Sequence, residues 1–469
     1  MASDNIVGAI IRSLECRKIL LTLASQLGLA DNPALRNALR VDEERVEALL
    51  VRIFDSKSAE DYVLGLKGDP AQKFLDVVQA ALDRGFLIVQ KHSQKAGQII
   101  RKLSESCDTL PSSLFVTGVT GREQHPTFGG GYADIYRASY GNMTVALKHM
   151  RHFLRGADSR SLRLKFCREA LVWKDLHHPH ILSFIGIDRE SFPSPSSLCM
   201  VSPWMEHGTV LQYLKDHGSA NVDRLLFEVS QGLHYLHSCN IVHGDLRGTN
   251  ILVNEDWSAC LTDFGLSVFS DASAPMNSPT RGGSILWMAP ELIAPDRFGY
   301  EFARTPATDV YAFGCVCVEL HTGRPPFSEL SEGSALLKII NGERAARPSG
   351  IPAMSDTLWR HVMEYWAESP VARPTTEVVV QHMFCPSAAQ KPKASRRLRP
   401  LPLPNTLRPL PNTPGPPPKH DSFTPHRMIK NGVAQPKQLR PLPLPNALRP
   451  LPSTPLRNNT LAPYHMIRN

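Results

Sequence analysis

The sequence predicts an α+β fold in which a helical region comes first, strands and helices follow, and a disordered tail ends the chain. Apolar residues recur at helical spacing before residue 104, and short apolar strands flank a glycine-rich stretch at 128–136. From Pro386 on, 20 of 84 residues are proline, so this segment cannot bury a core of its own. We therefore divide the chain into three parts, 1–121, 122–384 and 385–469.

The composition is that of a globular protein, with 42% hydrophobic and 20% charged residues. The nine cysteines form no C-x-x-C pair, which argues against a disulfide framework or a zinc site and favours a reducing compartment. No apolar run approaches the roughly 20 residues that a membrane-spanning helix needs. We therefore expect a protein of the cytoplasm or the nucleus.

The positive charge of the chain lies in its tail. From Pro386 to Asn469 there are 14 Lys or Arg residues and one Asp, a charge of +13, against +8 for the whole chain. The residues before Pro386 therefore carry a charge of −5. For this reason we predict no nucleic-acid binding by the folded part.

The N-terminal region, 1–121, is predicted to be a small helical bundle or arm. Its segment 71–82 places Phe74, Leu75, Val78, Ala81 and Leu82 on one face, and the Asp-Asn-Pro sequence at 31–33 marks a helix stop and a new start. The region contains no cluster of catalytic side chains. We expect it to be a packing and partner-binding module.

The glycine-rich stretch runs from Phe128 to Tyr136 and holds Gly129, Gly130 and Gly131. Glycines let a backbone fold closely over phosphates and direct N–H groups at them, although many loops have three glycines. The strand 145–148 follows and ends in Lys148. A strand of alternating residues can direct this lysine inward, towards the phosphates over which the glycine-rich loop would fold.

A helix predicted over 162–176 supplies an acidic partner for that lysine. Leu162, Phe166, Ala170 and Trp173 share one face of it, and Glu169 is the only glutamate between Lys148 and the end of the helix. The next segment, 178–182, is predicted to close the helix and start a strand. A further buried strand is predicted at 198–201, after a polar Pro/Ser-rich hairpin tip.

The most informative stretch is Ile-Val-His-Gly-Asp-Leu-Arg-Gly-Thr-Asn at 241–250, followed by Asp-Phe-Gly at 263–265. It contains Asp245, then Asn250 five residues later and Asp263 thirteen residues after that. This is the spacing of a proton acceptor and two metal ligands in protein kinases. A lone Asp is more often a surface charge or a helix cap, so the argument rests on the joint pattern.

Residues 124–383, in which these motifs occur in order, resemble a eukaryotic protein kinase of the tyrosine-kinase-like group. They are similar to the expanded kinases of mushroom-forming fungi, in which H-G-D-L often replaces H-R-D-L. The resemblance implies a bilobal protein kinase fold, with a small β-rich lobe and a large helical lobe. It also implies an enzyme of intracellular signalling that uses ATP and Mg²⁺ to phosphorylate protein substrates.

The resemblance assigns a role to each motif. Asp245 would accept a hydrogen bond from the substrate hydroxyl, and Arg247 would neutralise the γ-phosphate. Lys148 would bind the α- and β-phosphates and pair with Glu169. Asn250 and Asp263 would hold Mg²⁺, a hard cation that prefers oxygen ligands. The remaining nucleotide-binding residues would be Gly129, Gly130, Gly131, Ile135, Ala146 and the backbone of Met205.

The sequence departs from the family pattern at two places. Aligned on Ile135, the glycine-rich loop has Phe128 and Ala133 where the pattern has its first and third glycines. Gly244 stands where most kinases have an arginine that pairs with a phosphate on the activation loop. We therefore hypothesise that activity does not depend on phosphorylating the segment between Asp263 and Glu291.

The acceptor residue is predicted to be Ser or Thr. Ser284 stands where Ser/Thr kinases carry a Thr that is bonded to the catalytic Asp, whereas Arg247 also occurs in some tyrosine kinases. A tyrosine-directed kinase is therefore one alternative. The other is a pseudokinase scaffold, which the altered glycine loop and Gly244 keep open.

Three further residues have structural roles implied by the resemblance. Asp309 would cap the backbone of the catalytic loop near His243, and Glu291 would pair with Arg373 in the large lobe. Ser202 would guard the pocket behind the adenine. Each of these is an expectation about a buried polar contact or a small side chain.

The tail contains an internal duplication, because 398–411 recurs with one change at 439–452. Each copy holds Arg-x-x-Pro-x-x-Pro, from Arg408 to Pro414 and from Arg449 to Pro455. Polyproline II with an anchoring cation is what SH3 domains bind, so an SH3-type partner is one prediction. A basic spacer is the equally supported alternative, since Pro-rich tails match such short motifs by chance.

Overall fold

The computed structural model describes residues 2–85, 87, 89–129, 133–150, 159–192, 198–218, 221–263, 268–269, 285–350 and 353–384. The predicted disordered tail, with both Arg-x-x-Pro-x-x-Pro motifs, lies outside these residues. Residues 2–384 belong to one compact unit, Met1–Thr406. Among the helices in the described ranges, none is both long and apolar enough to span a membrane.

The N-terminal region is helical, as predicted. Asn32 caps the second helix, since its side-chain oxygen accepts the N–H groups of Ala34 and Leu35 at 2.9 and 3.3 Å. Proline at the first position of that helix needs no hydrogen-bond partner for its nitrogen. The helices are α1 (Ala2–Gln26), α2 (Pro33–Phe54), α3 (Lys57–Leu64), α4 (Gly68–Asp83) and α5 (Gln90–Cys107).

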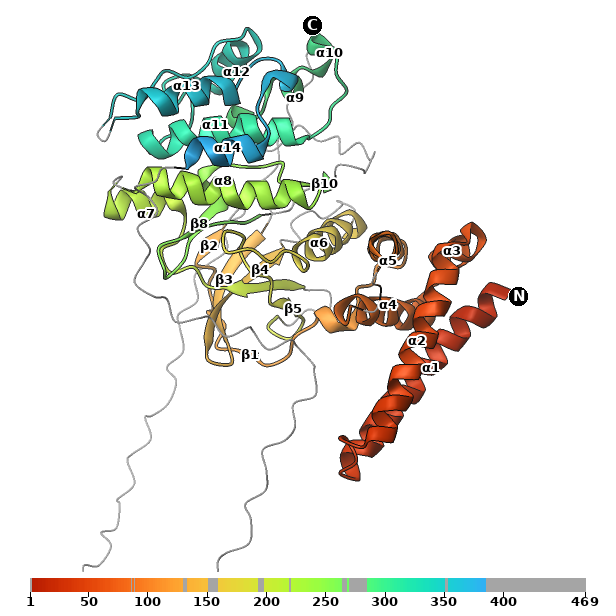
Figure 1. The fold of residues 1–469 in the computed structure, drawn as a ribbon. Coiled ribbons are helices and arrows are strands. Elements are labelled where there is room, and N and C mark those ends of the chain that lie inside the picture. Colours follow the sequence, from red (N-terminus) through yellow and green to blue (C-terminus); the bar gives the residue numbers. More distant parts are fainter. Residues whose placement is uncertain are drawn as a thin grey trace, which may run out of the picture. The chain divides into compact units, whose positions relative to one another are not determined.

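Helix α4 packs against α1 and α5 (Figure 1). The face predicted from its sequence is buried: Phe74, Leu75 and Val78 are fully covered, and Leu82 is partly covered. Ile99 and Ile100 of α5 are buried in the same hydrophobic cluster. The packing of these amphipathic faces supplies stability that short helices lack alone.

The small lobe contains an antiparallel sheet in the order β1-β3-β4-β6-β5, with β2 paired to β3 (Figure 1). A two-residue turn joins β3 to β4, and Gly141 there has a φ of +57°, which glycine adopts without strain. Strand β4 is therefore central, with β3 on one side and β6 on the other. The strands are β1 (Val119–Thr120), β2 (Phe128–Gly129), β3 (Ala133–Tyr140), β4 (Met143–Met150), β5 (Gly186–Asp188) and β6 (Cys199–Pro203).

One helix, α6 (Ser159–Trp173), belongs to the small lobe and buries Phe166, Ala170 and Trp173 as predicted. The prediction that a strand starts within 178–182 is wrong. Ile181 makes only an isolated bridge to Leu261, because its N–H closes a local turn. The chain there runs alongside the large lobe, and the strand of the small-lobe sheet begins later, at β5.

The large lobe is mainly helical and is built around α11, which is buried at every position from Thr308 to Leu320. Cys315 and Cys317 are core residues of this helix. Figure 1 shows α8, α14 and α13 lying around it. The helices are α7 (Val210–His217), α8 (Val222–Ser238), α9 (Pro290–Ile293), α10 (Pro295–Phe298), α11 (Pro306–Thr322), α12 (Glu332–Ile340), α13 (Asp356–Tyr365) and α14 (Thr376–Met383). The short strands are β7 (Ile241–Val242), β8 (Ile251–Val253), β9 (Ala259–Leu261) and β10 (Val268–Phe269), and the 3-10 turns in the described residues are η1 (Ser112–Leu114), η2 (Gly248–Asn250), η4 (Ile285–Trp287) and η5 (Pro370–Ala372).

The predicted ion pair between Glu291 and Arg373 is present in this lobe. Two parallel hydrogen bonds join the side chains, from Arg373 Nη1 to Glu291 Oε1 at 2.6 Å and from Nη2 to Oε2 at 2.9 Å. Both residues are buried. The bidentate geometry ties α9 to the segment that precedes α14.

Candidate active site

In the structure, Lys148 and Glu169 form the predicted contact within the small lobe. Lys148 lies on β4 directly opposite Ile135 of β3. Its Nζ donates to Glu169 Oε1 of α6 at 2.5 Å and to Asp263 Oδ1 at 3.1 Å. The predicted pair of Lys148 and Glu169 is therefore present, and Asp263, predicted as a metal ligand, meets the same ammonium group.

This ammonium group keeps its charge although the side chain of Lys148 is only 18% exposed. Burial alone would lower the pKa of Lys148, but the negative charges of Asp263 and Glu169 raise it, and the net effect is a pKa above the ordinary value. The side chain of Glu169 is only 3% exposed, whereas that of Asp263 is 32% exposed. The group can therefore offer a fixed positive charge to the phosphates of a nucleotide.

The catalytic loop brings Asp245 and Asn250 into direct contact. Asn250 Nδ2 donates to the Asp245 backbone oxygen at 2.8 Å and to its Oδ2 at 3.1 Å, and both residues are buried. This contact fixes the amide orientation, so that nitrogen faces Asp245 and the oxygen remains an acceptor. Arg247 lies near the same carboxylate, with its Nε 3.9 Å from Asp245 Oδ2.

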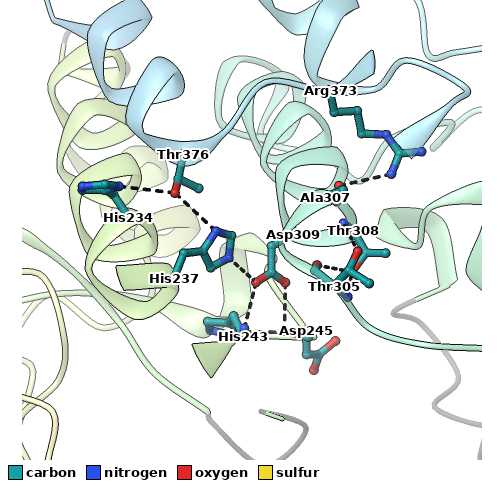
Figure 2. A network of polar contacts seen from close by, with 11 residues as sticks. His234, His237, His243, Asp245, Thr305, Ala307, Thr308, Asp309, Arg373 and Thr376 are labelled. Carbon is teal, nitrogen blue, oxygen red and sulfur yellow. Dashed lines mark hydrogen bonds and ion pairs between the residues drawn. The ribbon is translucent and has the colours of Figure 1, made fainter. Parts of the chain in front are cut away.

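Asp309, at the start of α11, holds the backbone of this loop in place, as predicted. Its carboxylate accepts the His243 N–H at 2.8 Å and the Gly244 N–H at 2.9 Å (Figure 2). The His243 ring is fully buried, and its Nε2 lies 3.0 Å from the Thr262 carbonyl oxygen. His243 therefore has a structural role and connects the catalytic loop to the residue before Asp263.

Figure 2 also shows a polar chain that extends from Asp309 to the last helix. His237 Nε2 of α8 lies 2.9 Å from Asp309 Oδ2, and its Nδ1 lies 3.3 Å from the Thr376 hydroxyl. The same hydroxyl lies 3.4 Å from His234 Nδ1. No motif indicates this connection, because Thr376 is 139 residues from His237.

Glu319 is another residue of the site that no sequence motif indicates. It is a buried carboxylate on α11 whose Oε2 accepts the Gly248 N–H at 2.8 Å and the Trp287 Nε1–H at 2.9 Å. Burial raises its pKa to about 7, although these two hydrogen bonds and the charge of Arg247 oppose the shift. An acidic residue inside the apolar run at 315–320 is the signal that could have revealed it.

The segment between the lobes follows β6. Ser202 is buried and lies opposite Ala146 of β4, so a small side chain stands at the predicted guard position. The Trp204 N–H donates to the Thr144 carbonyl at 3.0 Å, and the Met205 carbonyl accepts the Gly208 N–H at 3.0 Å. The role of the Met205 N–H as an adenine donor stays a prediction.

Several predicted positions lie at or beyond the edge of the described residues. Gly129 is described and pairs with Asp134 across β2 and β3. Gly130 and Gly131 lie outside the described residues, as do the Phe-Gly that follows Asp263 and the predicted acceptor-type marker Ser284.

Comparison with known proteins agrees with this geometry. The family model for protein tyrosine and serine/threonine kinases matches residues 125–383. The chain belongs to this family. Serine/threonine-protein kinase STY46 of Arabidopsis thaliana is 28% identical over 266 residues, which are 55% of this chain and 43% of that protein. Serine/threonine/tyrosine-protein kinase HT1 of the same plant is 30% identical over 258 residues, 54% of this chain and 62% of that protein.

A third relative, cell division control protein 7 of Schizosaccharomyces pombe, is 31% identical over 212 residues, 45% of this chain and 18% of that protein. The chain therefore spans less than two thirds of the length of each of these relatives. The matched segments have the length of the kinase domain. The 1–121 and 385–469 boundaries that the sequence suggests stay predictions.

Protein kinases use ATP and Mg²⁺, and the residues present suit both. Asn250 and Asp263 supply the amide and carboxylate oxygens that Mg²⁺ prefers, and its other ligands in such sites are phosphate oxygens and water. Lys148 supplies the cation for the phosphates. The donor set is that of a hard cation held between protein and nucleotide.

Proposed function

We propose that the protein transfers the γ-phosphate of ATP to Ser or Thr hydroxyls of protein substrates in intracellular signalling. The observation that supports it best is the joint presence of two arrangements. Lys148 donates hydrogen bonds to Glu169 and Asp263, and Asn250 donates one to Asp245. A scaffold without catalytic function does not need both arrangements.

In the proposed reaction, Asp245 accepts a hydrogen bond from the substrate hydroxyl and orients it towards the γ-phosphorus. The hydroxyl oxygen forms a bond to phosphorus, the bond from phosphorus to the β,γ-bridging oxygen breaks, and ADP leaves. The hydroxyl proton passes to Asp245. Positioning matters more than basicity here, because the transition state is loose.

The cations around this path stabilise charge. Lys148, held by Glu169, binds the non-transferred phosphates, and Arg247 is close enough to Asp245 to face the γ-phosphate. Mg²⁺ held by Asn250 and Asp263 would supply further positive charge at the phosphates. The nucleotide would also contact Gly129, Gly130, Gly131, Ile135, Ala146 and Met205.

The preference for Ser or Thr rests on Ser284 and on the names of the relatives. STY46 is named a serine/threonine kinase, and HT1 is named a serine/threonine/tyrosine kinase. The similarity to the tyrosine-kinase-like group, and to its expanded fungal members with H-G-D-L, is consistent with either acceptor. A tyrosine-directed kinase therefore remains the second candidate.

One experiment tests the proposal against a pseudokinase scaffold. The purified full chain and the Asp245→Asn variant are incubated with γ-labelled ATP, Mg²⁺ and a generic protein substrate. We expect the variant to lose at least about 100-fold in labelling while its thermal unfolding midpoint stays unchanged. Phosphoamino-acid analysis of the product then decides between Ser/Thr and Tyr, and equal labelling by both proteins would remove the enzyme proposal.

Two proposals concern regulation and partners. Gly244 cannot bind an activation-loop phosphate through a side chain, so we propose that activity is independent of phosphorylation there.

For the tail we propose docking of an SH3-type domain at 408–414 and 449–455, in a protein of the cytoplasm or the nucleus. Peptides of the two segments that bound no SH3 domain would leave the basic-spacer alternative.

A further inference from the structure

The N-terminal region packs on the helix that carries Glu169. Between Phe166 and Trp173, every residue of α6 is buried except Arg168. A surface helix normally keeps a polar face in solvent, so burial all round means that other elements cover it on more than one side. One side meets β4 through Glu169 and Lys148, and helix α5 of the N-terminal region also packs on α6 (Figure 1).

The exposed residue of this stretch is itself tied to α5. Arg168 Nε donates to Glu105 Oε1 at 2.6 Å, and Nη2 donates to Oε2 at 3.2 Å. The side chains are 44% and 31% exposed. A bidentate pair fixes the orientation of the guanidinium group as well as its position, so it can hold the rotation of α6 about its axis.

A second ion pair joins the end of α5 to the first half of α6. Asp108, the residue that caps α5, has its Oδ2 2.7 Å from Arg163 Nε. A negative charge is locally unfavourable at a helix C-terminus, and the φ of Asp108 is +54°. The pair with Arg163 compensates for the unfavourable charge and adds a contact between α5 and α6.

Buried apolar side chains of both helices belong to the same hydrophobic core. Ile100 and Leu103 of α5 belong to one continuous hydrophobic cluster with Phe166 and Ala170 of α6. All four are nearly or fully buried. The N-terminal helices and the kinase domain thus share a core, and α6 is not free to move without disturbing it.

We propose that Glu105 and Asp108, through Arg168 and Arg163, are positioning residues for catalysis that keep Glu169 against Lys148. The inference rests on the proposed phosphotransfer. Arg168 immediately precedes Glu169, so a rotation of α6 that withdraws Glu169 from Lys148 also pulls Arg168 away from Glu105. The helical region therefore stabilises the paired state of α6 from within the same chain.

Charge reversal tests this coupling in the full chain. Glu105→Lys and Arg168→Glu each place like charges across the interface, and the double variant restores opposite charges. We expect each single variant to lower kcat by about three- to thirtyfold, and the double variant to recover most of the loss. Hydrogen exchange of the amides at 163–173 should accelerate in the single variants and slow again in the double variant.

The control is Glu15→Lys. Glu15 pairs with Lys73 between α1 and α4 at 2.6 Å, and the side chains are 46% and 32% exposed, close to the values for Glu105 and Arg168. This pair does not involve α6. We expect Glu15→Lys to leave kcat and the exchange at 163–173 unchanged even if it alters the thermal unfolding midpoint, which separates positioning from general stability.

Two results would overturn the coupling: single variants with wild-type exchange at 163–173, or a double variant that recovers neither kcat nor exchange. If the wild-type chain transfers no phosphate, the proposed function fails. The exchange measurement still decides the coupling in that case, because it requires no turnover. The two failures are therefore distinguishable.

Discussion

Glu319 of α11 accepts the backbone N–H of Gly248 in the catalytic loop at 2.8 Å. The same oxygen accepts the indole N–H of Trp287, which lies just before Pro290 at the start of α9. One buried carboxylate therefore joins the catalytic loop, the central helix of the large lobe and the segment that leads into α9. Its protonation state should affect both stability and the geometry of the loop.

The first prediction concerns pH. Burial raises the pKa of Glu319 from 4.5 to about 7 in the folded protein. Between pH 4.5 and about 7, the folded state therefore keeps a proton on Glu319 that the unfolded state has lost. The contribution of the Glu319 proton to the free energy of unfolding is complete below about pH 4.5 and is lost as the pH rises through 7. In Glu319→Gln, denaturant unfolding should lose this pH dependence, which amounts to about 3 kcal/mol at most.

The control for this titration is Glu255→Gln, at an exposed turn, which should keep the wild-type pH profile. If the profiles of Glu319→Gln and wild type coincide between pH 5 and 8 (roughly the window of the shift), Glu319 does not titrate there.

The second prediction concerns Gly248. A Cβ at this position would lie 2.8 Å from Leu211 Cγ and 3.0 Å from Glu319 Cδ. Gly248→Ala should therefore displace the loop from Glu319, destabilise the protein by about 1–3 kcal/mol and lower kcat. Gly333→Ala in α12 is the matched control, because nothing lies within 4 Å of its added Cβ. It should leave kcat at the wild-type value, and an equal effect of both substitutions would argue against the packing explanation.

The sequence predicts the contacts whose residues stand in fixed order and spacing. Lys148 pairs with Glu169 as expected, because each motif specifies both the residue type and the element that carries it. The contacts of Lys148 with Asp263 and of Asn250 with Asp245 join further residues of these motifs. The amphipathic faces of the N-terminal helices follow from apolar periodicity for the same reason.

The contacts between distant elements are not predictable in this way. Glu105 and Arg168 are 63 residues apart, and neither stands out from other surface charges in the sequence. One acid in an apolar helix indicates that Glu319 is a buried carboxylate, but it does not indicate that its donors are the N–H groups of Gly248 and Trp287. The strand expected at 178–182 does not form because the Ile181 N–H is used in a local turn to the His178 carbonyl, and Ile181 makes only an isolated bridge to Leu261.

The third prediction concerns the buried ion pair. Glu291→Ala leaves the Arg373 guanidinium buried without its carboxylate, which should destabilise the protein by about 3–5 kcal/mol in denaturant unfolding. Glu44→Ala removes an exposed pair with Arg40 on α2 and should cost at most about 1 kcal/mol. Similar losses for both variants would mean that Arg373 finds other acceptors, such as the Ala307 and Glu368 carbonyls that it already contacts.

The fourth prediction concerns regulation at Gly244. Its backbone has a φ of +77°, its N–H donates to Asp309, and its carbonyl accepts Arg304 Nε at 3.1 Å. These contacts hold the loop through the backbone, and both partners lie after Glu291 in the sequence. We therefore expect phosphatase-treated protein to keep its kcat within about twofold of untreated protein, with Asp245→Asn as the inactive background.

Substitution of the glycine separates this backbone role from any effect of phosphate. Gly244→Ala adds a Cβ to a left-handed conformation and should destabilise the protein by about 1 kcal/mol, since L-residues disfavour that region. Its activity should be as insensitive to phosphatase as that of the wild type, because alanine offers no cation for a phosphate. Loss of activity in the wild type after phosphatase treatment, with phosphate mapped between Asp263 and Glu291, would show that another cation replaces the missing arginine.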